Sequence, residues 1–393
     1  MPTGSELRDL RTGLRLAARA LQARSVQERA QAIEAACRRL LAADQLDGLE
    51  LRRALLRSTG LSAQGIEHGL QSTLRVFTGE ALVALHAGRK PARTPGLAAV
   101  VLAGNVFSAA ARPLLLPLLC GWPVLLKAAS SDDAFPRALH RALAEIDPVL
   151  GAACAVVTFG REDRELRDAL IEDVELLSIY GDDDTVAAFA AIRSDGTRLI
   201  AHGHGLGLAF VATSALADAA LVHATAQAIA RDVAAYDQRG CLSPHAVLVQ
   251  RGAACDAQGF ALRLAQALEA CALDWPLGEL PHEAAAAQVQ WRGVAAVRGE
   301  LHAHAGGAVS YWGAAPLRVS PGYRNVAVHE CEDLAALRAW LAPLSLQLKA
   351  LAVAGDAERE GLTGCAPYVC AAGAMQEPPL ETWLDGLHPC EGL

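Results

Sequence analysis

Apolar residues recur every three to four positions through the first ninety residues of the chain. This spacing predicts amphipathic helices, because positions three and four apart lie on the same face of a helix. Ser62 follows a polar break, and we expect its side-chain oxygen to cap the last of these helices. The predicted helices cover residues 7–21, 26–43, 46–56 and 63–85.

The pattern changes after residue 96. Short apolar runs now alternate with segments of helical spacing, and the order strand, helix, strand predicts parallel pairing with right-handed crossovers. We therefore expect an α/β fold with a doubly wound parallel sheet, whose ligands lie at the C-terminal ends of the strands. The predicted strands are 97–102, 124–127, 155–158, 174–179 and 198–201, and the predicted helices begin near residue 108 or cover 134–146, 162–171 and 184–193.

The second half of the chain continues the α/β pattern up to about residue 360. The tail from residue 361 is rich in Gly, Pro and Cys and is expected to be irregular. The strands predicted in this half are 208–212, 246–249 and 348–354, and the helices are 219–235, 256–272 and 333–341.

Composition and charge narrow the function classes. The net charge of −8 is spread along the 393 residues without a basic run, which disfavours nucleic acid and anionic membranes as partners. The start of the chain lacks a signal-peptide pattern, and Asn105, Arg112 and prolines interrupt the apolar stretch 97–126, so we expect no membrane span. Ten scattered cysteines without a CxxC pair indicate reduced thiols in the cytoplasm and no metal site.

One cysteine stands in a setting that suits a nucleophile. Cys241 follows a short polar turn at 237–240, between a predicted helix and a predicted strand. That order can place a thiol at the mouth of a cleft, and Gly240 leaves the neighbouring backbone unobstructed. The Cys241 N–H could then point at whatever the thiolate attacks. A buried structural cysteine is the alternative, since free cysteines are among the most buried residues.

Polar residues follow three of the predicted strands. Each also has a structural interpretation, as a turn residue or as a solvated lysine at a strand end. The dinucleotide fingerprint GxGxxG is absent after a strand, and the glycine-rich run 203–207 precedes a strand instead of a helix. The residues at the strand ends are Asn105, then Lys127 with Ser130 and Ser131, then Tyr180 with Gly181.

Taken in order with the histidine-glycine run 202–205 and the Cys241 turn, these residues resemble the aldehyde dehydrogenase superfamily. The chain is most similar to the LuxC-type acyl-CoA reductase branch. Three stretches carry that resemblance: the motif Y-D-Q-x-x-C-x-S-P at 236–244, the segment 58–62, and a tail motif ending in W-x-D-G at 373–386. The stretches at 202–203 and 240–241 also resemble γ-glutamyl phosphate reductases, a sister branch.

The resemblance implies a cofactor domain, a catalytic domain and a cleft between them. It also implies that Cys241 accepts the acyl group, that Asn105 and the Cys241 N–H bind the oxyanion, and that Lys127 binds the adenosine ribose of the cofactor. The implied organisation is a helical part of the cofactor domain at 1–90, an α/β cofactor-binding domain at 91–212, a catalytic domain at 213–360, and a tail at 361–393 that makes oligomer contacts.

The sequence departs from the oxidising dehydrogenases, which carry a general-base glutamate where this chain reads 202–205. No acid stands there, which suits reduction. His204 or His202 could act as an acid or base, and a structural histidine is the alternative. No acid stands directly beside Lys127 either, where a carboxylate would repel a 2′-phosphate. This favours NADPH over NADH, because Ser130 could donate a hydrogen bond to that phosphate. Ser131, Tyr180 and Gly181 are further expected cofactor contacts.

We therefore expect an enzyme that reduces an acyl thioester, a fatty acyl-CoA in the family resembled, to the aldehyde through an acyl-Cys241 intermediate. An acyl-phosphate reductase and a non-reducing acyl-carrying subunit are the alternatives. The resemblance also implies an acyl-activating ligase as partner and a homo-oligomer.

Overall fold

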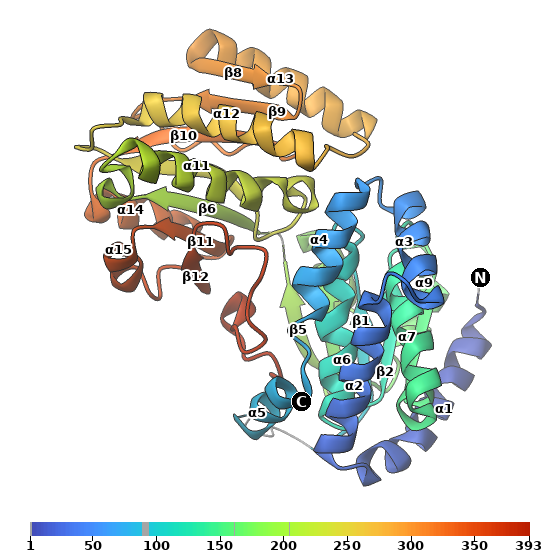
Figure 1. Cartoon of the computed structure of the whole chain (residues 1–393). Helices are drawn as coiled ribbons and strands as arrows, with labels where there is room; N and C mark the ends of the chain where they lie inside the picture. Colours follow the sequence, from blue (N-terminus) through green and yellow to red (C-terminus); the bar gives the residue numbers. More distant parts are fainter. Residues whose placement is uncertain (1, 89–93, 161, 204) are drawn as a thin grey trace.

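The computed structural model describes residues 2–88, 94–160, 162–203 and 205–393. Two separate sheets, one of five strands and one of seven, form the centres of two halves of the molecule (Figure 1). The first sheet lies among the N-terminal helices, and the second lies beneath the helices of the C-terminal half. The predicted α/β fold with a doubly wound parallel sheet and a second α/β part is confirmed.

The first sheet has the strand order β3-β2-β1-β4-β5, and all its strands are parallel. From β1 the chain adds β2 and β3 on one side of the sheet and then returns to add β4 and β5 on the other side. The C-terminal ends of β1 and β4 therefore flank the crevice where such folds bind ligands. Its strands are β1 (Ala98–Val101), β2 (Val124–Ala128), β3 (Cys154–Thr158), β4 (Leu176–Tyr180) and β5 (Arg198–His202).

Helices cover both faces of this sheet. Successive residues of a strand point to opposite faces, so the buried strands contribute to a separate core on each side. Val100 packs into a core with α2, α6 and α7, whereas Ala99 packs into a core with α1, α9 and α10. The helices of the first half are α1 (Gly4–Ala23), α2 (Val26–Leu41), α3 (Leu46–Ser58), α4 (Ala63–Leu74), α5 (Gly79–Gly88), α6 (Ala111–Leu119), α7 (Ala134–Ile146), α8 (Pro148–Ala152), α9 (Arg164–Ile171) and α10 (Asp183–Ala190).

Ser62 caps α4 as predicted, through a hydrogen bond from the Gly65 N–H to its side chain. The single helix predicted over 63–85 is wrong, because the chain forms two helices there. The second begins after Thr78, whose side-chain oxygen accepts a hydrogen bond from the Ala81 N–H. An N-cap inside an otherwise apolar pattern ends one helix and starts the next.

The second sheet has the order β12-β11-β6-β7-β10-β9-β8, parallel except for the antiparallel pair of β8 and β9. Helices α11 and α12 cover one face and α14 packs on the other. Its elements are β6 (Leu206–Val211), α11 (Ala219–Ala234), β7 (Pro244–Gln250), α12 (Ala257–Asp274), α13 (His282–Arg298), β8 (Glu300–His304), β9 (Gly307–Tyr311), β10 (Asn325–Cys331), α14 (Leu334–Leu341), β11 (Leu348–Ala354), α15 (Asp356–Gly361) and β12 (Tyr368–Ala371).

The strand predicted at 208–212 corresponds to β6, which pairs with β7 and β11 of the second sheet. The expected irregular tail contains β12, which pairs with β11. The rest of the tail crosses to the first half, where Leu380, Cys390 and Leu393 join its core and the C-terminus comes to lie (Figure 1). The division into domains by residue number stays a prediction.

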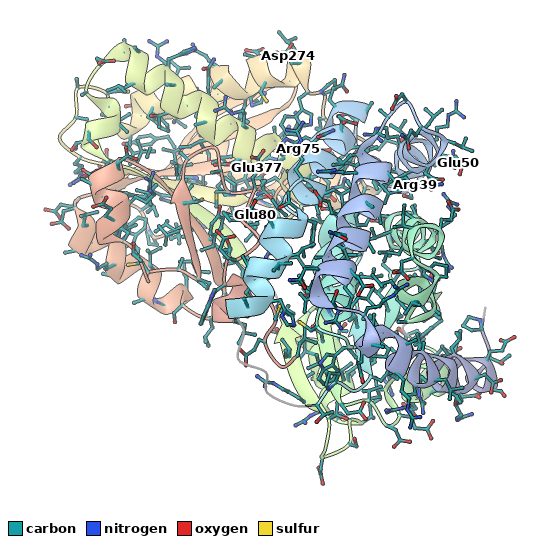
Figure 2. All side chains as sticks on the ribbon, turned by 60° about the horizontal axis from the view of Figure 1, so that its bottom comes forward. Arg39, Glu50, Arg75, Glu80, Asp274 and Glu377 are labelled. Carbon is teal, nitrogen blue, oxygen red and sulfur yellow. The ribbon has the colours of Figure 1, made fainter. Side chains whose placement is uncertain are left out.

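Side chains fill the region where the two halves meet. Arg75 at the end of α4 and Glu377 of the tail lie in the middle of the molecule (Figure 2). The His68 side chain of α4 is close enough to Glu377 for the two to interact electrostatically. Among the residues described, no helix combines the length and apolar character needed to cross a membrane.

Gly69 of α4 gives a stability prediction at this junction. A Cβ there would lie 2.7 Å from Tyr236 Cε1 and 2.8 Å from Phe107 Cζ, whereas a Cβ at Gly13 of α1 would meet nothing within 4 Å. We expect Gly69→Ala to destabilise the protein by about 1–3 kcal/mol through overpacking. The control Gly13→Ala should stabilise it by about 0.5–1 kcal/mol. Equal thermal unfolding midpoints for the two variants would contradict this packing.

Candidate active site

The cysteine turn begins with three consecutive residues in the left-handed backbone region. Tyr236, Asp237 and Gln238 have φ of 52°, 51° and 62°. Residues with side chains rarely adopt this conformation, and each such residue costs about 1–3 kcal/mol. It persists only where several surrounding contacts hold the residue in this conformation. The side chains of all three residues are buried and bonded, each to a different part of the molecule.

Tyr236 ties the turn to the first half. Its hydroxyl oxygen lies 2.7 Å from Ser108 Oγ and 3.1 Å from Thr73 Oγ1, and it donates to the Gly69 carbonyl at 3.2 Å. Its ring packs edge-on against Phe107, with the ring centroids 5.8 Å apart. The start of the turn is therefore fixed against α4 and against the chain that follows β1.

Asp237 forms a buried ion pair with Arg324. The Arg324 Nη2 and Nε donate to Asp237 Oδ1 at 2.7 and 3.0 Å, and the Gly278 N–H donates to Oδ2 at 3.0 Å. Arg324 also donates to the Trp275 carbonyl at 2.6 Å. A charge pair this deeply buried needs such additional hydrogen bonds to offset its loss of hydration.

Gln238 completes the anchoring on the side of the second sheet. Its Nε2 donates to the Pro244 and Asn325 carbonyls at 2.7 and 2.8 Å, and its Oε1 accepts from the Asn325 N–H at 2.9 Å. The side chain thus bridges the starts of the neighbouring strands β7 and β10. With all three anchors in place, the position of Cys241 is set by both halves of the molecule.

Cys241 itself is exposed. A Cβ built on the preceding Gly240 would lie 3.6 Å from Val106 Cγ2 and 3.5 Å from Gln376 Oε1. The turn that carries Asn105 and the C-terminal tail therefore both lie against the cysteine turn. Asn105 is exposed in that turn. The turn that carries Cys241, the predicted nucleophile, therefore lies next to the turn that carries Asn105, the predicted oxyanion donor.

The predicted cofactor residues lie at the C-terminal edge of the first sheet. In the sheet register Val101 of β1 pairs with Lys127 on one side and with Ile179, the residue before Tyr180, on the other. A Cβ at Gly104 would lie 3.0 Å from Ser131 Oγ, so the turns after β1 and β2 touch. Gly181 directly follows β4.

Lys127 is buried, and its Nζ lies 3.4 Å from the Ala128 carbonyl and 5.3 Å from the Phe159 ring centroid. Desolvation by these surroundings lowers the pKa of its amine. Ser130 donates to the Phe159 carbonyl at 3.2 Å, and Ser131 is exposed. The predicted acid or base His204 lies outside the described residues.

The structure adds two charged residues that the sequence interpretation did not assign. Asp385 of the tail bonds His202 Nδ1 of β5 at 2.5 Å through Oδ2 and forms an ion pair with Lys349 of β11 through Oδ1. The His202 ring stacks on Tyr180 with centroids 4.1 Å apart. The only sequence signal was the tail motif W-x-D-G, whose aspartate is Asp385.

The thiol and this cluster interact electrostatically. The Cys241 residue is exposed, but the protein packed around the sulfur desolvates it, and with the charges of its neighbours the thiol pKa is raised to about 11. Desolvation makes the largest contribution to this rise. Within that value, the Asp385 charge also acts to raise the pKa, and the Lys349 charge acts to lower it. Burial alone would raise the pKa of Asp385, but its contacts with His202 and Lys349 outweigh burial and lower it.

The tail that carries Asp385 is attached to both halves. Asp232 of α11 accepts hydrogen bonds from the N–H groups of Gly373 and Met375 at 2.6 and 3.0 Å. Farther along, Arg112 of α6 donates to the carbonyls of three consecutive residues at 2.8–2.9 Å. These carbonyls belong to Pro378, Pro379 and Leu380.

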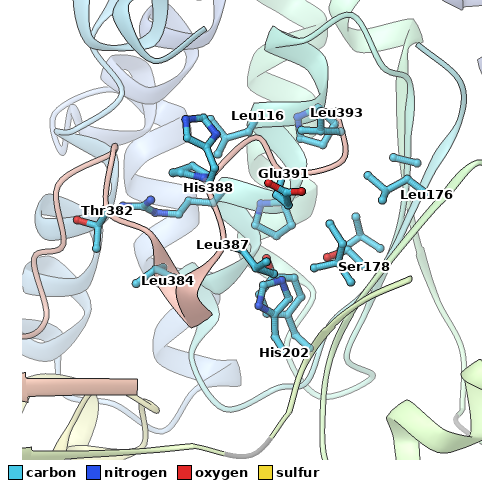
Figure 3. A pocket seen from close by; sticks show the side chains of 18 residues that line it. Leu116, Leu176, Ser178, His202, Thr382, Leu384, Leu387, His388, Glu391 and Leu393 are labelled. Carbon is cyan, nitrogen blue, oxygen red and sulfur yellow. The ribbon is translucent and has the colours of Figure 1, made fainter. Parts of the chain in front are cut away.

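A cavity of about 80 Å³ opens beside the cluster, between the first sheet, α6 and the tail (Figure 3). Tyr180 and His202 form the part of its wall nearest Asp385, and Arg112 and Glu391 add polar groups. Its apolar wall is formed by Leu116, Leu176, Ile200, Leu384, Leu387 and Leu393, among others.

Comparisons with known proteins agree with this geometry. A family model described as "Acyl-CoA reductase (LuxC)" matches residues 64–393. The comparison with curated proteins finds no match for this chain.

Solved structures of aldehyde dehydrogenases share the fold. A salicylaldehyde dehydrogenase from Pseudomonas putida G7 superimposes with a TM-score of 0.73 at 15% identity, over 94% of this chain and 82% of that one. An NAD-dependent benzaldehyde dehydrogenase from Corynebacterium glutamicum gives 0.74 at 16%, over 98% and 89%. At this identity the likeness concerns the fold.

The buried pair under the cysteine turn gives a second stability prediction. Replacing Asp237 with Asn leaves the Arg324 guanidinium buried without its anion, and we expect a loss of about 3–5 kcal/mol. The matched control is Arg251→Gln, which breaks the exposed Arg251–Glu330 pair (2.7 Å) and should cost at most about 1 kcal/mol. Calorimetric unfolding of both variants measures the difference. An Asp237→Asn midpoint as high as that of Arg251→Gln would show that the turn does not depend on this pair.

Proposed function

The chain belongs to the acyl-CoA reductase (LuxC) family, and from this we propose that it reduces an acyl thioester to the aldehyde through an acyl intermediate on Cys241. The observation that supports the proposal most is the position of the Cys241 thiol. Cys241 is an exposed residue on a turn held by buried side chains, and the turn after β1 and the C-terminal tail lie against this turn. A nucleophile presented this way meets the first requirement of covalent catalysis.

In the proposed first step the Cys241 thiolate attacks the acyl carbon and forms a new C–S bond. The carbonyl oxygen becomes an oxyanion, and the Asn105 amide and the Cys241 N–H are its proposed hydrogen-bond donors. Preorganised donors of this kind stabilise the charge as it develops, and removing one typically costs about 10²–10³ in rate. The original thiol of the thioester then leaves as a thiolate, and the acyl group stays on Cys241.

A nicotinamide cofactor, when bound, supplies the hydride for the second step. The acyl carbon on Cys241 accepts it, and the resulting thiohemiacetal expels the Cys241 thiolate and releases the aldehyde. No water has to be activated in this cycle, which agrees with the lack of a carboxylate in the sequence 202–205.

The described residues fit such a cofactor at the C-terminal edge of the first sheet. Lys127 is a buried amine whose described contacts are a carbonyl and an aromatic ring, with no carboxylate among them. Gly104 leaves room where a side chain would strike the turn after β2. We propose that Lys127, Ser130, Ser131, Tyr180 and Gly181 hold the cofactor, and that NADPH is preferred over NADH because no acid directly follows Lys127.

We also propose that the cavity beside Asp385 receives the acyl chain. Its apolar wall removes methylene groups from water, and each buried methylene contributes about 0.8 kcal/mol. At about 80 Å³ it is smaller than a cavity of about 150 Å³ that accommodates benzene, so it takes the first few carbons of a chain. Longer chains require the tail, which forms one wall, to move outward.

Intact-mass spectrometry with medium- and long-chain acyl-CoA tests the covalent step. We expect an acyl adduct on the wild type and on the control Cys255→Ala, and none on Cys241→Ala. Adding NADPH or NADH should remove the adduct and release aldehyde. An adduct that survives both cofactors would indicate an acyl-carrying subunit, and an adduct formed only from acyl phosphates would indicate the sister activity.

A series of acyl-CoA chain lengths tests the cavity. The side chain of Leu387 lines it, so Leu387→Trp should shorten it and lower kcat/KM for longer chains by about fourfold per excluded methylene. The shortest substrates should be affected least. Leu346→Trp is the control, because Leu346 is 92% exposed and lies outside the cavity lining. A uniform loss across all chain lengths would argue against this binding site.

A further inference from the structure

Three neighbouring strands of the second sheet begin at the same edge, close to the cysteine turn. In the register of β6 with its neighbours, Leu206 pairs with Leu348 of β11, and Gly207 pairs with Pro244 of β7. Cys241 comes three residues before Pro244, and Lys349 comes one residue after Leu348. The lysine and the cysteine therefore lie on either side of the start of β6.

Two glycines at the start of β6 allow both chains to approach closely. A Cβ at Gly205 would lie 2.2 Å from Lys349 Cγ, so the stem of the lysine crosses this residue. A Cβ at Gly207 would lie 2.3 Å from the Leu242 carbonyl oxygen, so the cysteine turn crosses the strand two residues later. A side chain at either position would push one of these elements away.

The ammonium group of Lys349 is fixed by the tail. Its side chain is 12% exposed and forms an ion pair with Asp385, whose side chain is 16% exposed. The second carboxylate oxygen of Asp385 is bonded to His202 Nδ1 of β5. Asp385 thus joins the second sheet to the first, and it does so from a left-handed backbone conformation with φ of 56°.

We propose that Lys349 is the cation that stabilises the Cys241 thiolate, and that Asp385 is the positioning residue that holds Lys349 beside it. The inference rests on the proposed function, because it assigns these residues to the ionisation of the attacking thiol. The thiol proton goes to solvent, the thiolate forms the bond to the acyl carbon, and the same thiolate reappears when the aldehyde leaves. Lys349 faces a negative charge at both points.

The charges around the sulfur act in opposite directions. Lys349 of β11 favours the thiolate, and Asp385 of the tail disfavours it. Tyr180 of β4 interacts with the thiol, and its raised pKa keeps it neutral at physiological pH. His202 of β5 is bonded to Asp385. On the turn itself, the Arg239 guanidinium donates to the Thr59 and Tyr236 carbonyls at 2.9 and 3.2 Å. Among the described residues, Lys349 is therefore the side-chain cation that favours the thiolate, and its ion pair with Asp385 weakens its effect.

Opposite charges predict opposite shifts. Lys349→Met removes the cation and leaves Asp385 facing the sulfur, so the thiol pKa should rise. Asp385→Asn removes the anion but keeps a side-chain oxygen that can accept a hydrogen bond from Lys349, so the lysine stays in place and the thiol pKa should fall. Because thiolate is the reactive form, alkylation at pH values below the pKa should become slower in the first variant and faster in the second.

The test is the pH dependence of Cys241 alkylation by iodoacetamide in the full chain, followed by peptide mass mapping. Near pH 8 we expect Lys349→Met to react at least about threefold more slowly and Asp385→Asn at least about threefold faster than wild type. Lys349→Arg, which keeps the charge, should restore most of the wild-type rate. Arg251→Gln is the control and should leave the profile unchanged, because Arg251 is an exposed cation that follows the end of β7, whereas Cys241 precedes its start. Unfolding midpoints establish that each variant is folded.

Equal profiles for Lys349→Met and wild type, or shifts of the two variants in the same direction, would overturn the inference. Failure of the proposed function gives a different result, because alkylation needs no acyl substrate. Shifted alkylation profiles without an acyl adduct from thioesters would leave the roles of Lys349 and Asp385 intact and reject the thioester activity. An acyl adduct from thioesters together with unshifted alkylation profiles would support the thioester activity and reject the roles of Lys349 and Asp385.

Discussion

The geometry of the site depends on three consecutive residues that adopt a left-handed backbone conformation just before the cysteine. This conformation costs free energy at Tyr236, Asp237 and Gln238 alike, and it persists because each side chain has buried partners in a different element. The tyrosine bonds to the first half, the aspartate to Arg324, and the glutamine to the starts of β7 and β10. Cys241 follows three residues later and has little freedom to move relative to either sheet.

The C-terminal tail is the second constraint, because it supplies a wall of the cavity and a charge of the site. Arg112 binds three of its carbonyls from the first half, and Asp232 binds two of its N–H groups from the second. Between these attachments and the C-terminus lies Asp385, which contacts a strand of each sheet. The two halves therefore form a complete site only when the tail lies between them.

Local patterns were enough to predict most elements of the first sheet and the helix, turn and strand around Cys241. Helix α13 was not predicted, because only Gln288 and Ala295 of it are buried and no apolar stripe marks it in the sequence. Local patterns also failed for the charged cluster. Lys349, Asp385 and His202 come from three elements far apart in sequence, and only tertiary packing brings them together. The tail motif singled out Asp385 without indicating its partners.

The charges of the site bear on the direction of the proposed chemistry. Burial raises the pKa of the Cys241 thiol, and a nearby cation counteracts this by stabilising the thiolate. In an oxidising cycle a base must also activate water, and no carboxylate occurs in the sequence 202–205 for that purpose. In a reductive cycle the thiolate attacks first and is expelled last, and water takes no part. A lysine held near the sulfur, together with the lack of a carboxylate in the sequence 202–205, suits the reductive cycle better than the oxidising one.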